Sequence, residues 1–268
     1  MSIVIDLTGQ VVLVTGGARG VGEGIVETFL RAGAEVEICG RTTPETLRET
    51  DGRTARFSAV DVRDDEQVAR WVSEVSDRRG RIDVLVNNAG GAPFVGFAEG
   101  SLRLHRKILD LNFFAAAAVS HAVYPIMAGQ SGGGSIVNVT SISARRPSPG
   151  TAVYGAAKAA LESLTGSLAV EWAPRIRVNA VSCGLVATDG AEDHYGDAES
   201  YARVAATIPR GRLADPREIG AACVVLASPL SSHITGAVLD VDGGGEWPAF
   251  LAHTPHASFA QRSEGTPS

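Results

Sequence analysis

Cysteine is scarce in this 268-residue chain, which has three, and none is placed for cross-linking. Cys39, Cys183 and Cys223 lie far apart and form no CxxC pair. This spacing argues against a disulfide framework and favours a reducing, cytoplasmic compartment. Long apolar runs are missing too, since no stretch approaches the roughly 18 apolar residues of a membrane helix. The first apolar run, residues 11–14, is too short for the core of a signal peptide.

Positive charge is in deficit, because 24 Lys and Arg face 30 Asp and Glu, for a formal net charge of −6. This acidic balance argues against a nucleic-acid partner or an anionic membrane surface. The six histidines are dispersed or lie near the carboxyl terminus, without the Cys or carboxylate neighbours that a metal site needs. No GxSxG sequence occurs, so a hydrolase nucleophile elbow has no support. We therefore expect neither a metal nor nucleophilic catalysis.

Short apolar runs alternate with helical patterns along the chain. We expect strands at residues 10–15, 35–39, 56–60, 82–87, 135–140, 176–181 and 237–241, and helices at 21–32, 65–79, 106–128, 152–172 and 216–227. Most of the strands are continuously apolar, as in a parallel sheet that is covered on both faces. The alternation predicts an α/β fold, with a doubly wound parallel sheet of about seven strands and helices on both faces. We expect one domain over residues 1–251 and a polar, mobile tail over residues 252–268.

The first expected strand and helix are joined by a glycine-rich segment, Thr15-Gly16-Gly17-Ala18-Arg19-Gly20-Val21-Gly22. Glycines let the backbone approach a pyrophosphate, and a helix N-terminus offers unpaired N–H groups. The spacing is GxxxGxG rather than the commoner GxGxxG, and alone such a turn is weak evidence. Its place at the first strand–helix junction favours a dinucleotide-binding loop.

The second expected strand ends at Gly40-Arg41, where an acidic residue would bind a ribose 2′-hydroxyl and repel a 2′-phosphate. No acid is present, and the Arg41 guanidinium can fork onto a phosphate. Arg19 adds a second cation nearby. We therefore favour NADP over NAD, with two solvated surface arginines as the alternative.

Tyr154 and Lys158 lie one helical turn apart, and Ser141 follows the fifth expected strand. A free tyrosine titrates near ~10, and a neighbouring cation lowers that pKa. Positions i and i+4 share a helix face, so we expect the Lys158 ammonium to make the Tyr154 hydroxyl more acidic. The pair by itself could equally be two surface neighbours.

Together these motifs resemble the short-chain dehydrogenase/reductases, in the compact branch that includes the β-ketoacyl carrier-protein reductases. The resemblance runs from about Leu7 to Gly245. It rests on ordered motifs: Thr15–Gly22, Asp61-Val62, Asn87-Asn88-Ala89-Gly90, Asn112, Ser141, Tyr154-x-x-x-Lys158 and Asp242-Gly243-Gly244. It implies a Rossmann-type domain, an NADP-dependent enzyme acting on CH–OH groups and a homotetramer built on helices 106–128 and 152–172.

The resemblance also implies individual roles. Tyr154 would be the general acid in reduction and the base in oxidation, with Lys158 on the nicotinamide ribose and Ser141 on the substrate oxygen. Asn112 would lie at a break in its helix and support a proton relay through water. The cofactor would be bound by Gly16, Gly17, Ala18, Arg19, Gly20, Val21, Gly22, Arg41, Asp61, Val62, Asn88, Ala89, Gly90, Tyr154, Lys158, Gly184, Val186 and Thr188. Asp61 would take the adenine amino group, and Thr188 the nicotinamide carboxamide.

The chain departs from the family pattern after the sixth strand, where Cys183-Gly184 replaces the usual Pro-Gly. We read Cys183 as a small buried residue whose N–H and freer φ loosen this loop. Val170, where carrier-protein reductases often have a basic residue, argues against a carrier-bound substrate.

Two variable segments, 91–106 and 187–208, would bound a partly apolar substrate pocket with Phe94, Phe97 and Tyr195. Acids of the second segment (Glu192, Asp193, Asp197 and Glu199) weakly disfavour anionic substrates, whereas Arg145 and Arg146 favour them, unless either set is solvated surface. The predicted reaction is hydride transfer between NADP(H) and a carbonyl or secondary alcohol. An NAD-linked dehydrogenase working oxidatively and a non-catalytic cofactor-binding regulator remain alternatives.

Overall fold

The computed structural model describes residues 4–188 and 195–255. Seven parallel strands form one sheet in the order β5-β2-β1-β6-β7-β8-β9. Their bounds are β1 Val11–Thr15, β2 Glu35–Gly40, β5 Arg56–Ala59, β6 Val84–Asn87, β7 Gly134–Ser141, β8 Ile176–Cys183 and β9 Val238–Val241. The expected doubly wound sheet of about seven strands is thus confirmed, with strand boundaries that differ by up to two residues.

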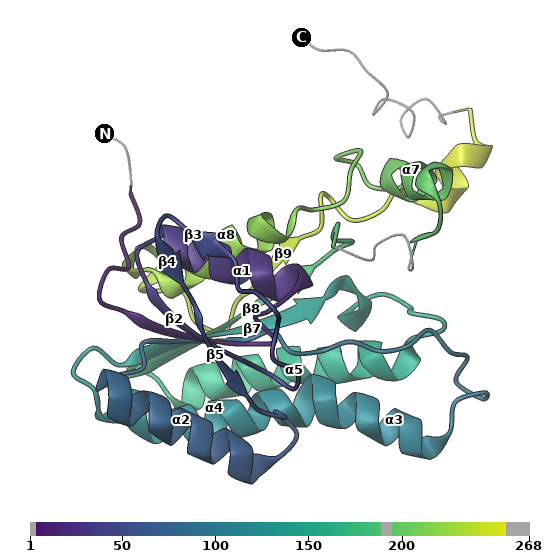
Figure 1. The fold of residues 1–268 in the computed structure, drawn as a ribbon. Helices are drawn as coiled ribbons and strands as arrows, with labels where there is room; N and C mark the ends of the chain where they lie inside the picture. The colour runs from purple at the N-terminus through teal and green to yellow at the C-terminus, as the bar shows by residue number, and fades with distance from the viewer. Residues whose placement is uncertain (1–3, 189–194, 256–268) are drawn as a thin grey trace.

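Helices cover both faces of the sheet, as Figure 1 shows, with α1 and α8 above it and α2, α4 and α5 below. Their bounds are α1 Gly20–Arg31, α2 Asp65–Arg79, α3 Leu102–Leu109, α4 Ala115–Gly129, α5 Ala152–Glu171, α7 Ala198–Ala206 and α8 Pro216–Ala227. Two apolar cores result: one joins the sheet to α1 and α8, the other joins it to α2, α4 and the end of α5. Strands buried on both faces explain the continuously apolar runs.

Three local features differ from the sequence expectations. The helix expected at 106–128 begins at Leu102 and contains a π-helical turn, η1, at Asp110–Phe114. The helix α7 was not expected, and neither was the two-stranded hairpin β3 (Glu49–Thr50) and β4 (Arg53–Thr54). Asp51 and Gly52 turn this hairpin with φ of 51° and 72°, the positive values that a tight two-residue turn requires.

Taken through the π turn, the helix spanning Leu102–Gly129 is long and apolar enough to cross a membrane by length and composition. This corrects the expectation that no segment reaches that length. The reason is structural: α4 is a core helix, with Val119, Val123 and Met127 packed between the sheet and α2. Core helices of this kind satisfy the same criterion.

The carboxyl-terminal region continues past the last strand as a short 3-10 helix, η4, at Ala249–His253. This helix crosses the expected domain boundary after residue 251. Most of the expected tail, residues 256–268, lies outside the described part of the chain. The sheet order places β2 and β6 on either side of β1, so β1 and β6 form the switch point where open α/β sheets bind ligands.

Candidate active site

The glycine-rich turn lies at the carboxyl end of β1, directly at the switch point. Gly16 has φ of 67° and donates its N–H to the Cys39 carbonyl at 2.8 Å. A Cβ at Gly22 would lie 2.1 Å from the Gly16 carbonyl oxygen, so only glycine fits there. Helix α1 begins without a side-chain cap, which leaves its first N–H groups available to an anion. The turn therefore fits the pyrophosphate of a dinucleotide.

The segment after β6 closes the other side of the switch point. The Asn88 side chain donates to the Thr15 and Gly16 carbonyls at 2.9 and 3.1 Å, and the Ala89 N–H donates to the Thr15 hydroxyl at 3.0 Å. These bonds fix the segment against the glycine turn. A Cβ at Gly90 would lie 2.7 Å from Asn112 Oδ1 and 3.2 Å from Lys158 Nζ. Gly90, which has no side chain, therefore lies where the segment after β6 contacts both Asn112 of η1 and Lys158 of α5.

Ser141 ends β7, and Tyr154 and Lys158 lie in the first two turns of α5. The side chains of Tyr154 and Ser141 interact, and this interaction lowers the Tyr154 pKa. Lys158 is buried, and its ammonium donates to the Val139 carbonyl at 2.8 Å while lying 5.7 Å from the centroid of the Tyr154 ring. The structure therefore brings together the three side chains that the sequence singled out.

The electrostatics of this group differ from the sequence expectation. Burial raises the pKa of Tyr154 to about 12, and the hydrogen bond from Ser141 offsets only part of that rise. Burial also lowers the pKa of Lys158 to about 8. The expected lowering of the Tyr154 pKa by Lys158 is not found: Lys158, whose ammonium donates to the Val139 carbonyl, is not among the causes of the shift. Desolvation is the largest cause.

Asn112 lies in the π turn η1, at the expected interruption of the helix. Its side chain accepts from the Gly91 N–H at 2.8 Å and donates to the Gly91 and Ile108 carbonyls, both at 2.9 Å. Both hydrogens of the Asn112 side-chain amide are therefore donated to backbone carbonyls. The side chain holds the Gly90-Gly91 segment in place, so a water relay would have to start from the main chain of Asn112.

The expected adenosine residues lie where β2 and β5 end. Gly40 pairs with Ala59 in the sheet, which brings Arg41 and Asp61 to the same edge. The positive charge of Arg41 contributes to lowering the Asp61 pKa. Arg63, which sequence reasoning missed, forks onto both Asp61 oxygens at 2.9 and 2.5 Å and is the main cause of that lowering. The sequence did carry a signal for this ion pair, because Arg63 lies two residues after Asp61.

The segment after β8 passes over the glycine turn. Thr188 lies beside Gly20, with its methyl carbon 3.5 Å from where a Gly20 Cβ would be. Val186 forms an isolated bridge with Ala214, and Gly184 lies so close to Asp242 that a Cβ would be 2.7 Å from its backbone. Cys183 is buried, and burial raises its thiol pKa to about 12, as expected of a packing residue.

The arginines after Ser141 are both paired. The Arg145 guanidinium donates to Glu162 at 3.0 Å and to both Asp240 oxygens at 2.9 Å. Arg146 donates to Glu246 at 2.5 Å. Their charges are neutralised, so the expected attraction for an anionic substrate loses its support.

The expected pocket residues are only partly assembled. Phe94 and Phe97 are largely exposed, although Val95 is bonded to the Gly150 carbonyl at 2.8 Å beside the start of α5. Tyr195 has its pKa raised by burial. Asp197 caps α7, and Glu199 forms an ion pair with Arg203 at 2.7 Å, while the other two acids lie outside the described residues. The acids of α7 thus have local structural partners.

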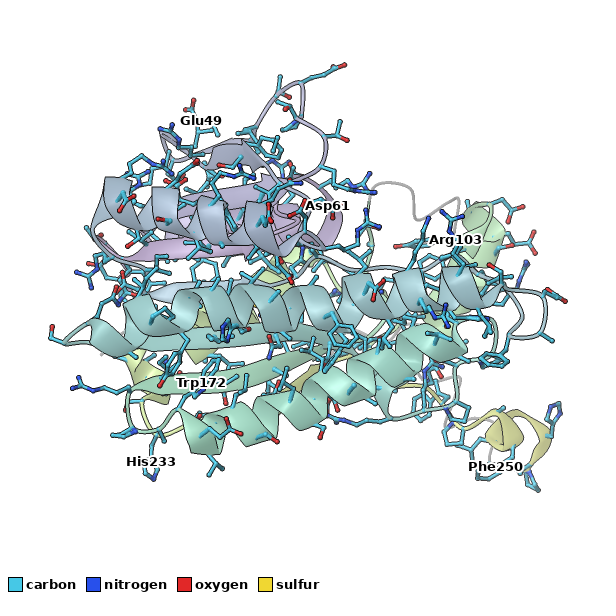
Figure 2. The ribbon with its side chains drawn as sticks, turned by 90° about the horizontal axis from the view of Figure 1, so that it is seen from below. Glu49, Asp61, Arg103, Trp172, His233 and Phe250 are labelled. Carbon is cyan, nitrogen blue, oxygen red and sulfur yellow. The ribbon has the colours of Figure 1, made fainter. Side chains whose placement is uncertain are left out.

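No group of three or more potential metal ligands occurs within residues 4–188 and 195–255. Figure 2 shows α3, η1 and α4 as one long helical path beside α5, with Arg103 near one end of that path. A glycine turn at the switch point, together with Ser141, Tyr154 and the buried Lys158, is the arrangement expected of an oxidoreductase on a dinucleotide-binding fold.

Comparisons with known proteins define the class further. The enoyl-(acyl carrier protein) reductase family model matches residues 16–246. The oxidoreductase UcpA of Escherichia coli is 40% identical over 255 residues, covering 90% of this chain and 96% of UcpA. An uncharacterized oxidoreductase of Mycobacterium tuberculosis is 37% identical over 247 residues, covering 90% and 94%. The ligand-free aldohexose dehydrogenase of Thermoplasma acidophilum superposes with a TM-score of 0.84 at 31% identity, covering 90% and 96%.

The chain therefore belongs to the short-chain dehydrogenase/reductase family, as its motifs indicated. Members of this family are oxidoreductases that act on CH–OH groups of small molecules with NAD(P)(H).

Proposed function

We propose that this protein transfers a hydride between NADP(H) and a carbonyl or secondary alcohol, with Tyr154 as the general acid and base. One observation carries the proposal: the side chains of Tyr154 and Ser141 interact beside buried Lys158, whose ammonium is held by the Val139 carbonyl, near the switch point of the sheet. The cofactor, when bound, supplies the hydride chemistry. Two converging donors can stabilise the negative charge that develops on a carbonyl oxygen.

Burial keeps the Tyr154 hydroxyl protonated, which is the form that would donate in carbonyl reduction. A phenol with a pKa of about 12 keeps its proton throughout the neutral range. The proton donor that carbonyl reduction needs is therefore present in its protonated form. The oxidative reaction needs the phenolate, which this environment disfavours.

Cofactor choice is proposed from the edge formed by β2 and β5. Arg19 and Arg41 are exposed, and neither has an ion-pair partner in the part of the chain that the structure describes. Both are available to a 2′-phosphate, and no acid ends β2 to repel one. Arg41 lies close enough to Asp61 to help lower its pKa, which supports a role for its charge at the proposed adenosine end of the site.

A carbonyl panel assayed with NADPH tests the reaction, and the same panel with NADH tests the cofactor. We expect turnover with NADPH and a marked preference for it over NADH. Arg41→Ala should remove most of that preference, whereas Arg103→Ala, which removes an exposed arginine of α3, should not. An unchanged NADP preference in Arg41→Ala would show that the phosphate assignment is wrong. Tight NADPH binding without turnover would favour the non-catalytic regulator.

We also propose a homotetramer in a reducing, cytoplasmic compartment. Phe114, Tyr124 and Val170 are exposed apolar side chains on the helices expected to form the subunit contacts. The three cysteines are free and buried, which suits a compartment without disulfides. Light scattering that gives a monomer at micromolar concentration would contradict the tetramer.

A further inference from the structure

Strand β7 and helix α5 are joined by a series of polar contacts that ends at the active-site hydroxyls. From the far end to the site, the contacts are Asn138–Thr165 at 2.9 Å, Thr140–Glu162 at 2.9 Å, the Val139 carbonyl to Lys158 at 2.8 Å, and Ser141–Tyr154. The first two contacts lie outside the expected reaction centre, and the last two involve its residues Lys158, Ser141 and Tyr154. The series fixes how α5 is aligned along β7.

Thr140 and Glu162 form the contact best placed to control this alignment. Thr140 directly precedes Ser141, and Glu162 lies two turns after Tyr154 on the same helix. The Thr140 hydroxyl donates to Glu162 Oε1, and Arg145 donates to Glu162 Oε2 at 3.0 Å. The carboxylate is only 14% exposed, so both bonds are made with little competition from water.

Arg145 extends the same contact to a third element. Its guanidinium also binds Asp240 on β9, and Arg145 itself ends the short 3-10 turn, η2 (Ile142–Ala144), that follows Ser141. Glu162 is therefore bonded to residues on both sides of Ser141, at positions 140 and 145. A shift of α5 relative to Ser141 would strain both bonds.

We propose that Thr140 and Glu162 are positioning residues that set the Ser141–Tyr154 contact, and thereby the rate of the chemical step. This inference rests on the proposed function for its kinetic part. The geometric part does not depend on any reaction. Because misplacement by about 1 Å can cost on the order of 10²-fold in rate, a partial loosening should lower kcat by roughly tenfold.

The kinetic test uses isosteric changes. Thr140→Val removes the hydroxyl at constant shape, and we expect a roughly tenfold loss of kcat with little change in KM for NADPH. Thr140→Ser restores the hydroxyl and should restore kcat. Glu162→Gln cannot accept from both Thr140 and Arg145, and we expect a smaller loss. Ser167→Ala, which removes an exposed α5 hydroxyl bonded to the Ser163 carbonyl, is the matched control and should leave kcat unchanged.

A second readout needs no turnover. The chain has four tyrosines, so labelling the carbon that bears each hydroxyl with ¹³C gives four NMR signals, and Tyr154→Phe identifies the one from position 154. Ser141→Ala shows how far this signal moves when the contact is lost. We expect Thr140→Val and Glu162→Gln to move it in the same direction, and Thr140→Ser to return it to the wild-type position.

The inference is overturned if the Tyr154 signal of Thr140→Val or, where that variant does not fold, of Glu162→Gln coincides with the wild type. It is also overturned if Thr140→Ser moves the signal as far as Thr140→Val. A wild-type protein that reduces no carbonyl would refute the proposed function, while the NMR comparison would still decide the positioning role.

Discussion

Gly90→Ala should damage the active site while leaving the backbone conformation acceptable for alanine. The φ of Gly90 is not positive, so the substitution causes no backbone strain. Its cost comes from the added methyl group, which would lie 2.7 Å from Asn112 Oδ1 and 3.2 Å from Lys158 Nζ. Neither atom can move freely, because Asn112 makes three hydrogen bonds to backbone atoms and Lys158 makes one.

The magnitude follows from these contacts. Inserting a methyl group into a well-packed site costs about 1–3 kcal/mol, and each lost hydrogen bond costs about 0.5–1.5 kcal/mol. Displacing Asn112 or Lys158 from one or two partners therefore predicts a loss of roughly 2–4 kcal/mol in the free energy of unfolding. Activity should fall further than stability alone implies, because Lys158 lies against the Tyr154 ring.

Urea unfolding and carbonyl reduction, measured on the same preparations, test this prediction. Gly166→Ala is the matched control: Gly166 lies inside α5 with nothing within 4 Å of an added Cβ. Alanine should stabilise that helix by up to about 1 kcal/mol. Equal stabilities of Gly90→Ala and wild type, with unchanged activity, would refute the reasoning from the packing of Gly90.

The remaining predictions concern buried charges and thiols. Burial lowers the pKa of Lys158 from 10.5 to about 8, so the unfolded chain binds the Lys158 proton more tightly than the folded chain. Below about pH 8 the folded wild type therefore carries the whole destabilisation caused by burying the ammonium charge. The stability advantage of Lys158→Met over wild type should shrink by roughly 3 kcal/mol as the pH rises to 10.5; thermal scans showing an advantage that grows with pH would contradict this. Arg177→Met should lower the free energy of unfolding in urea by roughly 2–4 kcal/mol. Arg177 donates to the Leu226 and Ala227 carbonyls at the end of α8 and to the Ile234 carbonyl beyond it. A loss under about 0.5 kcal/mol would mean that water replaces the guanidinium at these carbonyls. All three thiols are buried with raised pKa values, so alkylation should be slow in the native protein and fast in denaturant, and rapid native labelling would contradict their burial.

The sequence predicts the main sheet and its principal helices well, because buried parallel strands leave an unmistakable run of apolar residues. It misses elements whose formation depends on few residues or on distant contacts. The β3–β4 hairpin consists of two-residue strands, and the π turn at Asp110–Phe114 has no apolar periodicity of its own. Helix α7 is absent from the expectations because all of it retains solvent exposure.

The candidate site shows the same division. Motifs place Ser141, Tyr154 and Lys158 together, since chain order and strand ends determine which side chains meet at the switch point. They cannot give the direction of the Tyr154 pKa shift, which depends on burial. Nor do they reveal that Arg145 binds Glu162 and Asp240, because these partners lie 17 and 95 residues away.

NADPH-dependent reduction by Tyr154→Phe, beside the wild type and with NADPH binding measured by fluorescence on both, tests the proposed chemistry most directly. The substitution removes only the hydroxyl that would donate the proton. We expect NADPH affinity to fall by no more than about 0.5–1.5 kcal/mol, the net worth of one hydrogen bond, and reduction to fall by about 10²–10⁴-fold, the usual contribution of a positioned acid. A variant that reduces its carbonyl substrate as fast as the wild type would contradict the assignment of Tyr154.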